Sequence, residues 1–138
     1  MMLTLPPDYR PSDAEEFMNP IQAEYFRQKL LRWRADLLRE ADGTLASLSQ
    51  GGILESDITD RASVETERAL ELRTRDRARK LIAKIDQALS RIDNGAYGYC
   101  EETEEPIGLR RLEARPIATM SIEAQERHER MERVHRDD

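Results

Sequence analysis

Two carboxylates stand close together near the middle of the chain, Asp57 and Asp60, within the run Asp57-Ile58-Thr59-Asp60-Arg61-Ala62. One interpretation is helix capping, because Ser56 or Asp57 at a helix start accepts hydrogen bonds from free backbone N–H groups, and Asp60 then faces the positive end of the helix dipole. The other is binding, because exposed carboxylates could approach a metal ion or the basic residues of a partner. One aspartate can cap while the other points outward, so both interpretations stay open.

These acids do not make an enzyme site by themselves. A catalytic carboxylate pair needs a walled, water-poor pocket that separates the two pKa values and holds a substrate. The end of a pair of helices is too exposed to supply such a pocket. We therefore expect no catalysis by this chain alone.

A dense basic run lies further along the chain and consists of Arg73, Arg75, Arg77, Arg79, Lys80 and Lys84. At helical spacing, four of these residues share one side of the helix: Arg73, Arg77, Lys80 and Lys84. Such a run is typical of a solvated face that answers nearby acidic residues. The shared side could instead grip an acidic surface or a phosphate-rich ligand, since arginine and lysine bind both.

The single cysteine, Cys100, begins a second pattern of possible chemistry. It opens Cys100-x-x-Thr103, and Ser121-x-x-Ala124 follows later, which is the spacing of a four-thiolate zinc module with three ligands replaced. One thiolate cannot hold structural zinc with threonine, serine and alanine as companions. We therefore expect no bound metal and interpret Cys100 as a small buried hydrophobe.

Two long helices are predicted to position these residues. The first begins at Asn19-Pro20, because asparagine caps a helix and proline suits its first position. Its apolar residues recur every three or four positions: Ala23, Phe26, Leu30, Trp33, Leu37, Ala41, Leu45 and Leu48. The stretch Ser49-Gln50-Gly51-Gly52 breaks the pattern, since adjacent glycines disfavour a helix.

The second helix is predicted to run from Ser56 or Asp57 to Asn94-Gly95, which is a natural left-handed stop. Its stripe is Ala78, Ile82, Ile85, Leu89 and Ile92. Two long helices joined by a short glycine turn must be antiparallel, and narrow stripes on both indicate a coiled-coil hairpin. The expected fold is mostly all-α, with four parts: an N-terminal arm that belongs to the base (1–20), the hairpin (21–95, tip near 49–62), a degenerate zinc-finger segment (96–120) and a C-terminal helix (121–138) that packs on the base.

Composition agrees with a thin helical protein. The chain has 138 residues, 36% of them charged and 5% aromatic, with a mean hydropathy of −0.77. That leaves little material for a thick core. The net charge of −6 argues against a general nucleic-acid coat. No stretch approaches the roughly 20 apolar residues of a membrane span, and the N-terminus does not look like a signal peptide, so we expect a cytoplasmic protein.

Four segments of the chain match a known family. They are Asp57-x-x-Asp60-Arg61-Ala62, Glu71-Leu72-Arg73-x-Arg75-Asp76-Arg77-x-Arg79-Lys80-Leu81-Ile82, Tyr97-Gly98-Tyr99-Cys100-Glu101, and Ile107-Gly108-Leu109-Arg110-Arg111-Leu112-Glu113-Ala114-Arg115-Pro116. The match is continuous, in register and close to half of the chain. It resembles the DksA/TraR family of RNA polymerase-binding transcription factors, in the cysteine-poor form whose zinc finger is degenerate.

The resemblance implies a globular base and a hairpin that enters the secondary channel of bacterial RNA polymerase, with tip residues Asp57, Asp60 and Ala62 near the active site. Together with the alarmone ppGpp, such proteins lower ribosomal RNA transcription and activate some other promoters in the stringent response. They bind no specific DNA sequence. RNA polymerase and ppGpp are thus the implied partners, no membrane partner is expected, and a hairpin that closes on itself needs no second copy.

The resemblance also places ligand positions on this sequence. The family's ppGpp contacts at the polymerase interface fall on Leu81, Lys84 and Arg115. A fourth position, basic in relatives, is Gln125 here, which predicts a weaker response to ppGpp. The four zinc positions are Cys100, Thr103, Ser121 and Ala124, and cysteine-poor members keep the fold without metal, with Ile107, Leu109, Leu112, Ile117 and Ile122 packing the base.

Two other functions are compatible with the pattern. A transcript-cleavage stimulator of the Gre kind also presents acids at a hairpin tip, although its base has a different sequence. A coiled-coil adaptor unrelated to polymerase would use the same charged faces for another partner. The adaptor does not explain why an acidic tip accompanies the Arg-Leu-Glu-Ala-Arg-Pro segment.

Overall fold

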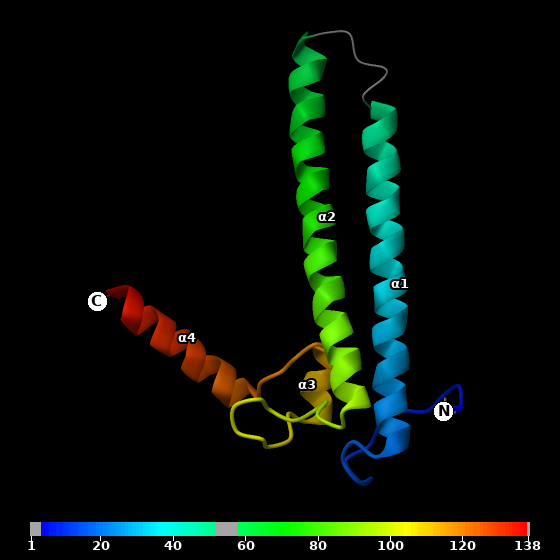
Figure 1. The fold of residues 1–138 in the computed structure, drawn as a ribbon, viewed down its shortest axis with the longest axis vertical. Helices are drawn as coiled ribbons and strands as arrows, with labels where there is room; N and C mark the ends of the chain where they lie inside the picture. The colour runs from blue at the N-terminus through cyan, green and yellow to red at the C-terminus, as the bar shows by residue number, and fades with distance from the viewer. Residues whose placement is uncertain (1–3, 52–57, 138) are drawn as a thin grey trace. The chain divides into compact units, whose positions relative to one another are not determined.

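The computed structural model describes residues 4–51 and 58–137, and side chains inside the helices are described for 20–43 and 63–135. The fold is helical, with α1 (Pro20–Gly51), α2 (Ile58–Asp93), α3 (Leu109–Ala114) and α4 (Ile122–Asp137) in chain order (Figure 1). The chain divides into two compact units: a hairpin unit, Leu31–Asp86, and a base unit made of Met1–Leu30 and Gln87–Asp138. The expected mostly α-helical fold is confirmed.

The start of α1 has the predicted cap. The Asn19 side-chain oxygen accepts a hydrogen bond from the backbone N–H of Gln22 at 2.9 Å, and Pro20 is the first helical residue. The helix continues through Ser49 to Gly51, so it ends slightly later than the sequence pattern suggested. The predicted turn beyond it, with Gly52 and Asp57, lies outside the described residues.

The end of α2 also follows its sequence signal. The helix ends at Asp93, and Gly95 adopts a left-handed φ of 76°. The N–H of Gly95 donates to the carbonyl of Ile92 at 3.1 Å, which satisfies one of the last carbonyls of the helix. The predicted stop at Asn94-Gly95 is confirmed.

In the hairpin unit, α1 and α2 run antiparallel and side by side (Figure 1). Their facing residues include Leu37, Ala78 and Ile85, which are all buried. Arg34 on α1 donates to both carboxylate oxygens of Asp86 on α2, at 2.7 and 3.4 Å, across the exposed flank of this seam. The buried residues of this unit thus lie on the two predicted apolar stripes, as expected for a slender pair of helices.

The base unit has its own small core, formed by buried side chains from α1, α2, α3 and the loop before α3: Phe26, Leu30, Ala88, Tyr97, Leu109 and Leu112. Tyr97 packs against Phe26 with ring centroids 5.7 Å apart, and its hydroxyl donates to the carbonyl of Pro116 at 2.8 Å. Burial, assisted by the negative charge of Glu113, raises the pKa of Tyr97 far above its ordinary value. The phenol therefore stays a protonated donor.

The arm before α1 is held on the base by a buried polar residue that the sequence did not single out. Gln22 is fully buried, and its side-chain oxygen accepts a hydrogen bond from the backbone N–H of Met18 at 2.8 Å. Its amide nitrogen donates to the carbonyl of Ser12 at 3.3 Å. The glutamine thus ties two points of the arm to α1.

The C-terminal helix does not pack as predicted. Ala124 is buried, but Ile122, Met131 and Val134 are 50–60% exposed. The expectation that α4 packs along the base, and that Ile122 belongs to its core, is wrong. The physical reason is that α4 carries charged residues at most positions. It therefore has no continuous apolar face that packing against the base would bury.

Within the part of the chain that the structure describes, no helix is long and apolar enough to span a bilayer.

Gly98→Ala is expected to destabilise the fold by about 1 to 3 kcal/mol, because Gly98 holds a φ of 90° that side chains disfavour. An added Cβ would also lie 2.8 Å from the Met18 methyl and 3.3 Å from the Phe17 ring. Thermal unfolding followed by circular dichroism measures the loss. Gly43→Ala, in a helix with nothing within 4 Å of the added Cβ, is the control and should stabilise slightly. Equal melting temperatures for the two variants would contradict the prediction.

Candidate functional site

The predicted acidic tip falls only partly on described residues. Asp57 lies outside them. Asp60 and Ala62 belong to the first turns of α2, and their side chains are among those not described. The directions of the tip carboxylates therefore stay a prediction from the sequence.

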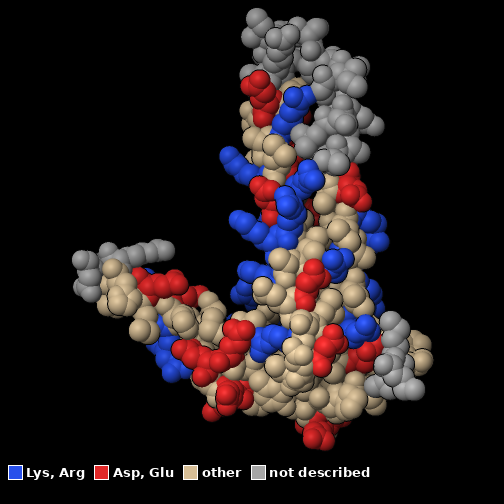
Figure 2. Space-filling view, viewed as in Figure 1, with Lys and Arg blue, Asp and Glu red and all other residues tan. Residues whose placement is uncertain are grey.

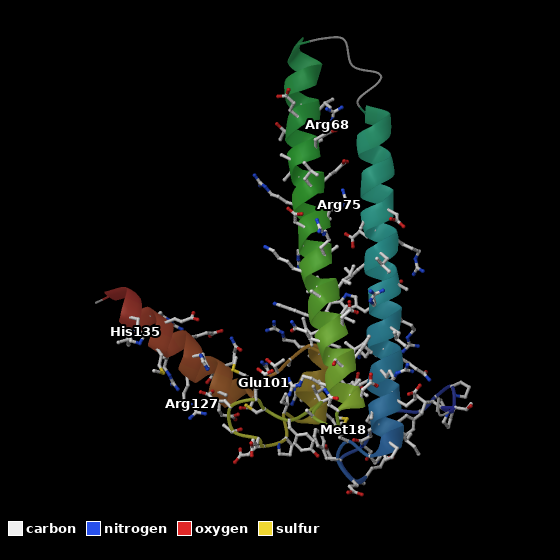
Figure 3. All side chains as sticks on the ribbon, in the orientation of Figure 1. Met18, Arg68, Arg75, Glu101, Arg127 and His135 are labelled. Carbon is white, nitrogen blue, oxygen red and sulfur yellow. The ribbon has the colours of Figure 1, made fainter. Side chains whose placement is uncertain are left out.

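The basic run is fully described and lies on α2, where Figure 2 shows blue side chains gathered along the helix. Between Leu72 and Ile85 there are six basic residues and one acidic residue, Asp76, so this stretch has a net charge of +5. Arg75, labelled in Figure 3, is half-buried, and the other five basic side chains are exposed. We call the four that share one side, Arg73, Arg77, Lys80 and Lys84, the basic stripe.

The basic stripe is not neutralised within the described part of the chain. The salt bridges of the described residues join other partners, such as Arg34 with Asp86 and Arg91 with Glu101, and none includes a residue of the stripe. The four residues of the stripe are thus solvated cations without a close acidic partner among the described residues. Four exposed, unpaired cations on one side of a helix form a surface that favours an acidic partner.

The four positions assigned to ppGpp are divided between the two units. Leu81, half-buried, and Lys84, exposed, lie on α2 in the hairpin unit. Arg115 is exposed at the end of α3 in the base unit, and its N–H donates to the carbonyl of Arg111 at 2.7 Å. Gln125 is half-buried on α4, where its side-chain amide donates to Glu129 at 3.3 Å. Leu81 and Lys84 thus belong to the hairpin unit, and Arg115 and Gln125 belong to the base unit.

The four former zinc positions are brought together in the base unit, but without a donor set for a metal. Cys100 and Ala124 are buried, and alanine offers no donor. The hydroxyl of Thr103 accepts from the N–H of Glu105 at 3.3 Å, and that of Ser121 accepts from the N–H of Ala124 at 3.2 Å. The described residues contain no cluster of three or more His, Cys, Asp or Glu that could hold a metal ion. These residues do not fit zinc.

The Cys100 thiol is more than a small hydrophobe. Burial opposes its ionisation, but hydrogen bonds donated by the Thr103 hydroxyl and by the N–H groups of Ser121, Thr103 and Glu102 outweigh burial and lower its pKa to about 6. The prediction that Cys100 is buried is confirmed, and the lowered pKa adds a polar side to its environment. The missed signal is the Cys100-x-x-Thr103 spacing itself, which brings N–H groups of the following residues toward the sulfur.

A titration checks this environment. The thiolate absorbance near 240 nm is expected to appear with a midpoint at about pH 6, and Cys100→Ser should abolish it. Because the folded pKa lies below that of an unfolded thiol, the thiolate contributes stability that is present at high pH and is lost as the pH falls through 6. An ordinary midpoint between pH 8 and 9 would contradict the prediction.

Two arginines that the sequence analysis did not single out hold the loops around Cys100 and Ser121. The guanidinium of Arg91, at the end of α2, donates to the carbonyl of Tyr99 at 2.8 Å, to that of Ala96 at 3.2 Å and to the carboxylate of Glu101 at 3.3 Å. Arg111 on α3 donates from Nε to the carbonyl of Met120 at 2.9 Å.

Comparison with known proteins gives consistent similarities. Residues 22–92 match the family described as "DnaK suppressor protein DksA, N-terminal domain", and residues 95–130 match "Prokaryotic dksA/traR C4-type zinc finger". The chain is 68% identical over 131 residues to the RNA polymerase-binding transcription factor DksA of Caulobacter vibrioides, covering 95% of this chain and 92% of that one. It is 44% identical over 115 residues to the protein of the same name from Escherichia coli K12, covering 83% and 76%. The structure of transcription factor DksA2 from Pseudomonas aeruginosa superposes with a TM-score of 0.79 at 46% identity, covering 90% and 94%.

Proposed function

Since the chain belongs to the DksA family of RNA polymerase-binding transcription factors, we propose that it enters the secondary channel of RNA polymerase and alters transcription initiation there. It is a regulator rather than an enzyme. Together with ppGpp it lowers ribosomal RNA transcription and activates some other promoters, as in the stringent response. It binds no specific DNA sequence and works in the cytoplasm, where the polymerase is.

The observation that carries this proposal is the basic stripe on a slender hairpin. A pair of helices with so few buried side chains, Leu37, Ala78 and Ile85 among them, is narrow enough for a channel in a large partner. The cations of the stripe, which have no salt-bridge partner among the described residues, supply an affinity for acidic walls, and electrostatic attraction speeds the encounter. In this proposal, Asp57 and Asp60 act at the far end of the hairpin, with the small Ala62 beside them.

Two assays separate the proposal from its alternatives. Co-purification with core RNA polymerase is expected here, and its absence would favour the adaptor unrelated to polymerase. Cleavage of nascent RNA in stalled complexes is not expected. Acceleration of that cleavage would instead assign the chain a Gre-like activity.

The ppGpp response is proposed to be present but weak. Leu81, Lys84 and Arg115 retain the positions assigned to ppGpp, whereas Gln125 adds no charge and already donates to Glu129. Gln125→Lys is expected to lower the ppGpp concentration for half-maximal inhibition about tenfold, because a charge-assisted contact to phosphate contributes about 1.5 to 3 kcal/mol. Titration of ppGpp in a transcription assay measures this shift. An unchanged dose response would count against Gln125 as the weakening residue, and Gln125→Met controls for the loss of the amide.

The finger segment is proposed to work without zinc, and the protein to act as a monomer. The absence of a donor set at Cys100, Thr103, Ser121 and Ala124 supports the first point, because each hydroxyl there accepts a backbone N–H. The closure of the hairpin upon itself supports the second.

A further inference from the structure

The degenerate finger raises the question of what holds its two loops in place without a metal. The first loop carries Cys100 and Thr103, and the second leads into Ser121 and Ala124. In a zinc finger the metal joins these loops directly. The chain has lost that link and must replace it with ordinary contacts.

The two arginines contact equivalent points of the loops. Arg91 donates to the carbonyl of Tyr99, the residue directly before Cys100. Arg111 donates to the carbonyl of Met120, the residue directly before Ser121. Each loop is therefore fixed, at the residue preceding its first former ligand position, to the helix that carries the arginine.

We propose that Arg91 and Arg111 are paired clamps that perform the positioning role of the missing metal. They keep both loops in the arrangement that a bound metal would otherwise impose. This inference rests on the metal-free function proposed above and adds the residues that make it possible.

The surroundings of Arg91 support a clamp rather than a surface side chain. Its side chain is only 18% exposed and reaches three acceptors, while its own carbonyl accepts the N–H groups of Ala96 and Tyr97 at 2.9 and 3.1 Å. Glu101, labelled in Figure 3, completes the guanidinium contacts at 3.3 Å. Both the side chain and the backbone of Arg91 thus hold the start of the first loop.

The two clamped loops also contact each other. The N–H of Glu101 donates to the carbonyl of Thr119 at 2.9 Å, which joins the two loops directly. Buried Cys100 and Ala124 fill the space between them. Because the bond from Glu101 to Thr119 joins the two loops directly, the Glu101 N–H is a sensitive reporter of whether they stay together.

Hydrogen exchange of the Glu101 amide tests the clamps in the isolated protein, without polymerase. Arg91→Gln and Arg111→Gln are each expected to speed its exchange about tenfold or more, because the lost bonds are charge-assisted. The matched control is Arg110→Gln, at an exposed arginine on the same short helix as Arg111, and should change exchange less than about twofold. Unchanged exchange in both clamp variants would overturn the proposal.

A second experiment separates a clamp from a generally stabilising residue. The variant Thr103→Cys/Ser121→Cys/Ala124→Cys restores four thiols beside Cys100 and is expected to bind one zinc per chain. With zinc bound, adding Arg91→Gln should change Glu101 exchange less than about threefold, and chelation should restore the full effect. Equal acceleration with and without zinc would overturn the clamp role, as would failure of the restored variant to bind zinc. Stoichiometric zinc in the parent protein would instead refute the metal-free finger itself, a result that the exchange comparison does not depend on.

Discussion

Asp60→Asn is expected to weaken inhibition of a ribosomal RNA promoter about tenfold while binding to RNA polymerase stays the same. Asp60 lies inside the first turn of α2, which begins at Ile58, so the substitution leaves the capping position itself unchanged. Loss of the carboxylate there costs the helix only about 0.3 to 1 kcal/mol of dipole stabilisation. The substitution removes only the negative charge that the proposal assigns to the tip. Transcript yield at a saturating concentration of the variant measures the effect.

Competition for polymerase against the labelled parent protein provides the control for Asp60→Asn. Equal affinity together with full inhibition by the variant would show that the tip charge is not the effector. Asp60→Ser, which also removes the charge, should behave like the asparagine variant. A difference between these two neutral variants would indicate that the side-chain shape matters more than the charge.

The second large effect is expected on the basic stripe. Arg77→Glu/Lys80→Glu reverses two neighbouring, exposed cations on α2 that make no salt bridge with any described residue. Affinity for RNA polymerase should fall about 100-fold, because like charges brought together at an interface cost several kcal/mol. The helix itself should persist, since glutamate has a high helix propensity and neither side chain is buried.

Arg32→Glu/Arg130→Glu is the matched control for the stripe. Both residues are exposed on helices and make no salt bridge within the described part of the chain, so the charge change is identical. This control is expected to bind polymerase within about threefold of the parent, and the difference between the pairs should shrink as salt is raised. Equal losses in both double variants would mean that only net charge matters and that the stripe is not a contact surface.

The helices could be predicted because their signals are local. Asn19-Pro20 and Asn94-Gly95 mark a start and a stop through bonds within one turn, and the structure has both. The three-four spacing of Leu37 and Ala78 with their neighbours likewise identified the buried side of each helix. Such signals depend only on residues within one or two helical turns of each other, so they can be identified from the sequence.

The contacts that organise the base could not be predicted in the same way. Gln22, Arg91 and Arg111 donate to or accept from backbone groups of residues up to ten positions away. Every residue offers a carbonyl, so the sequence does not mark which one is used. The wrong expectation for α4 has a related cause, because helical periodicity shows that a helix can form but not what covers it.

The sequence predicted which residues belong to the candidate site, but not their salt-bridge partners or the pKa of the Cys100 thiol. The sequence indicated the basic run, and only the structure shows that the stripe lacks partners among the described residues. For Cys100, the sequence indicated burial, whereas the convergence of three N–H groups and a hydroxyl on the sulfur required the folded loops.

The most direct test of the proposed function is transcription in vitro from a ribosomal RNA promoter, with purified RNA polymerase, this protein, and ppGpp either present or omitted. Lower transcript yield is expected with the protein alone, and a modest further decrease when ppGpp is added. Yield that stays unchanged at protein concentrations that saturate the polymerase would contradict the proposed function.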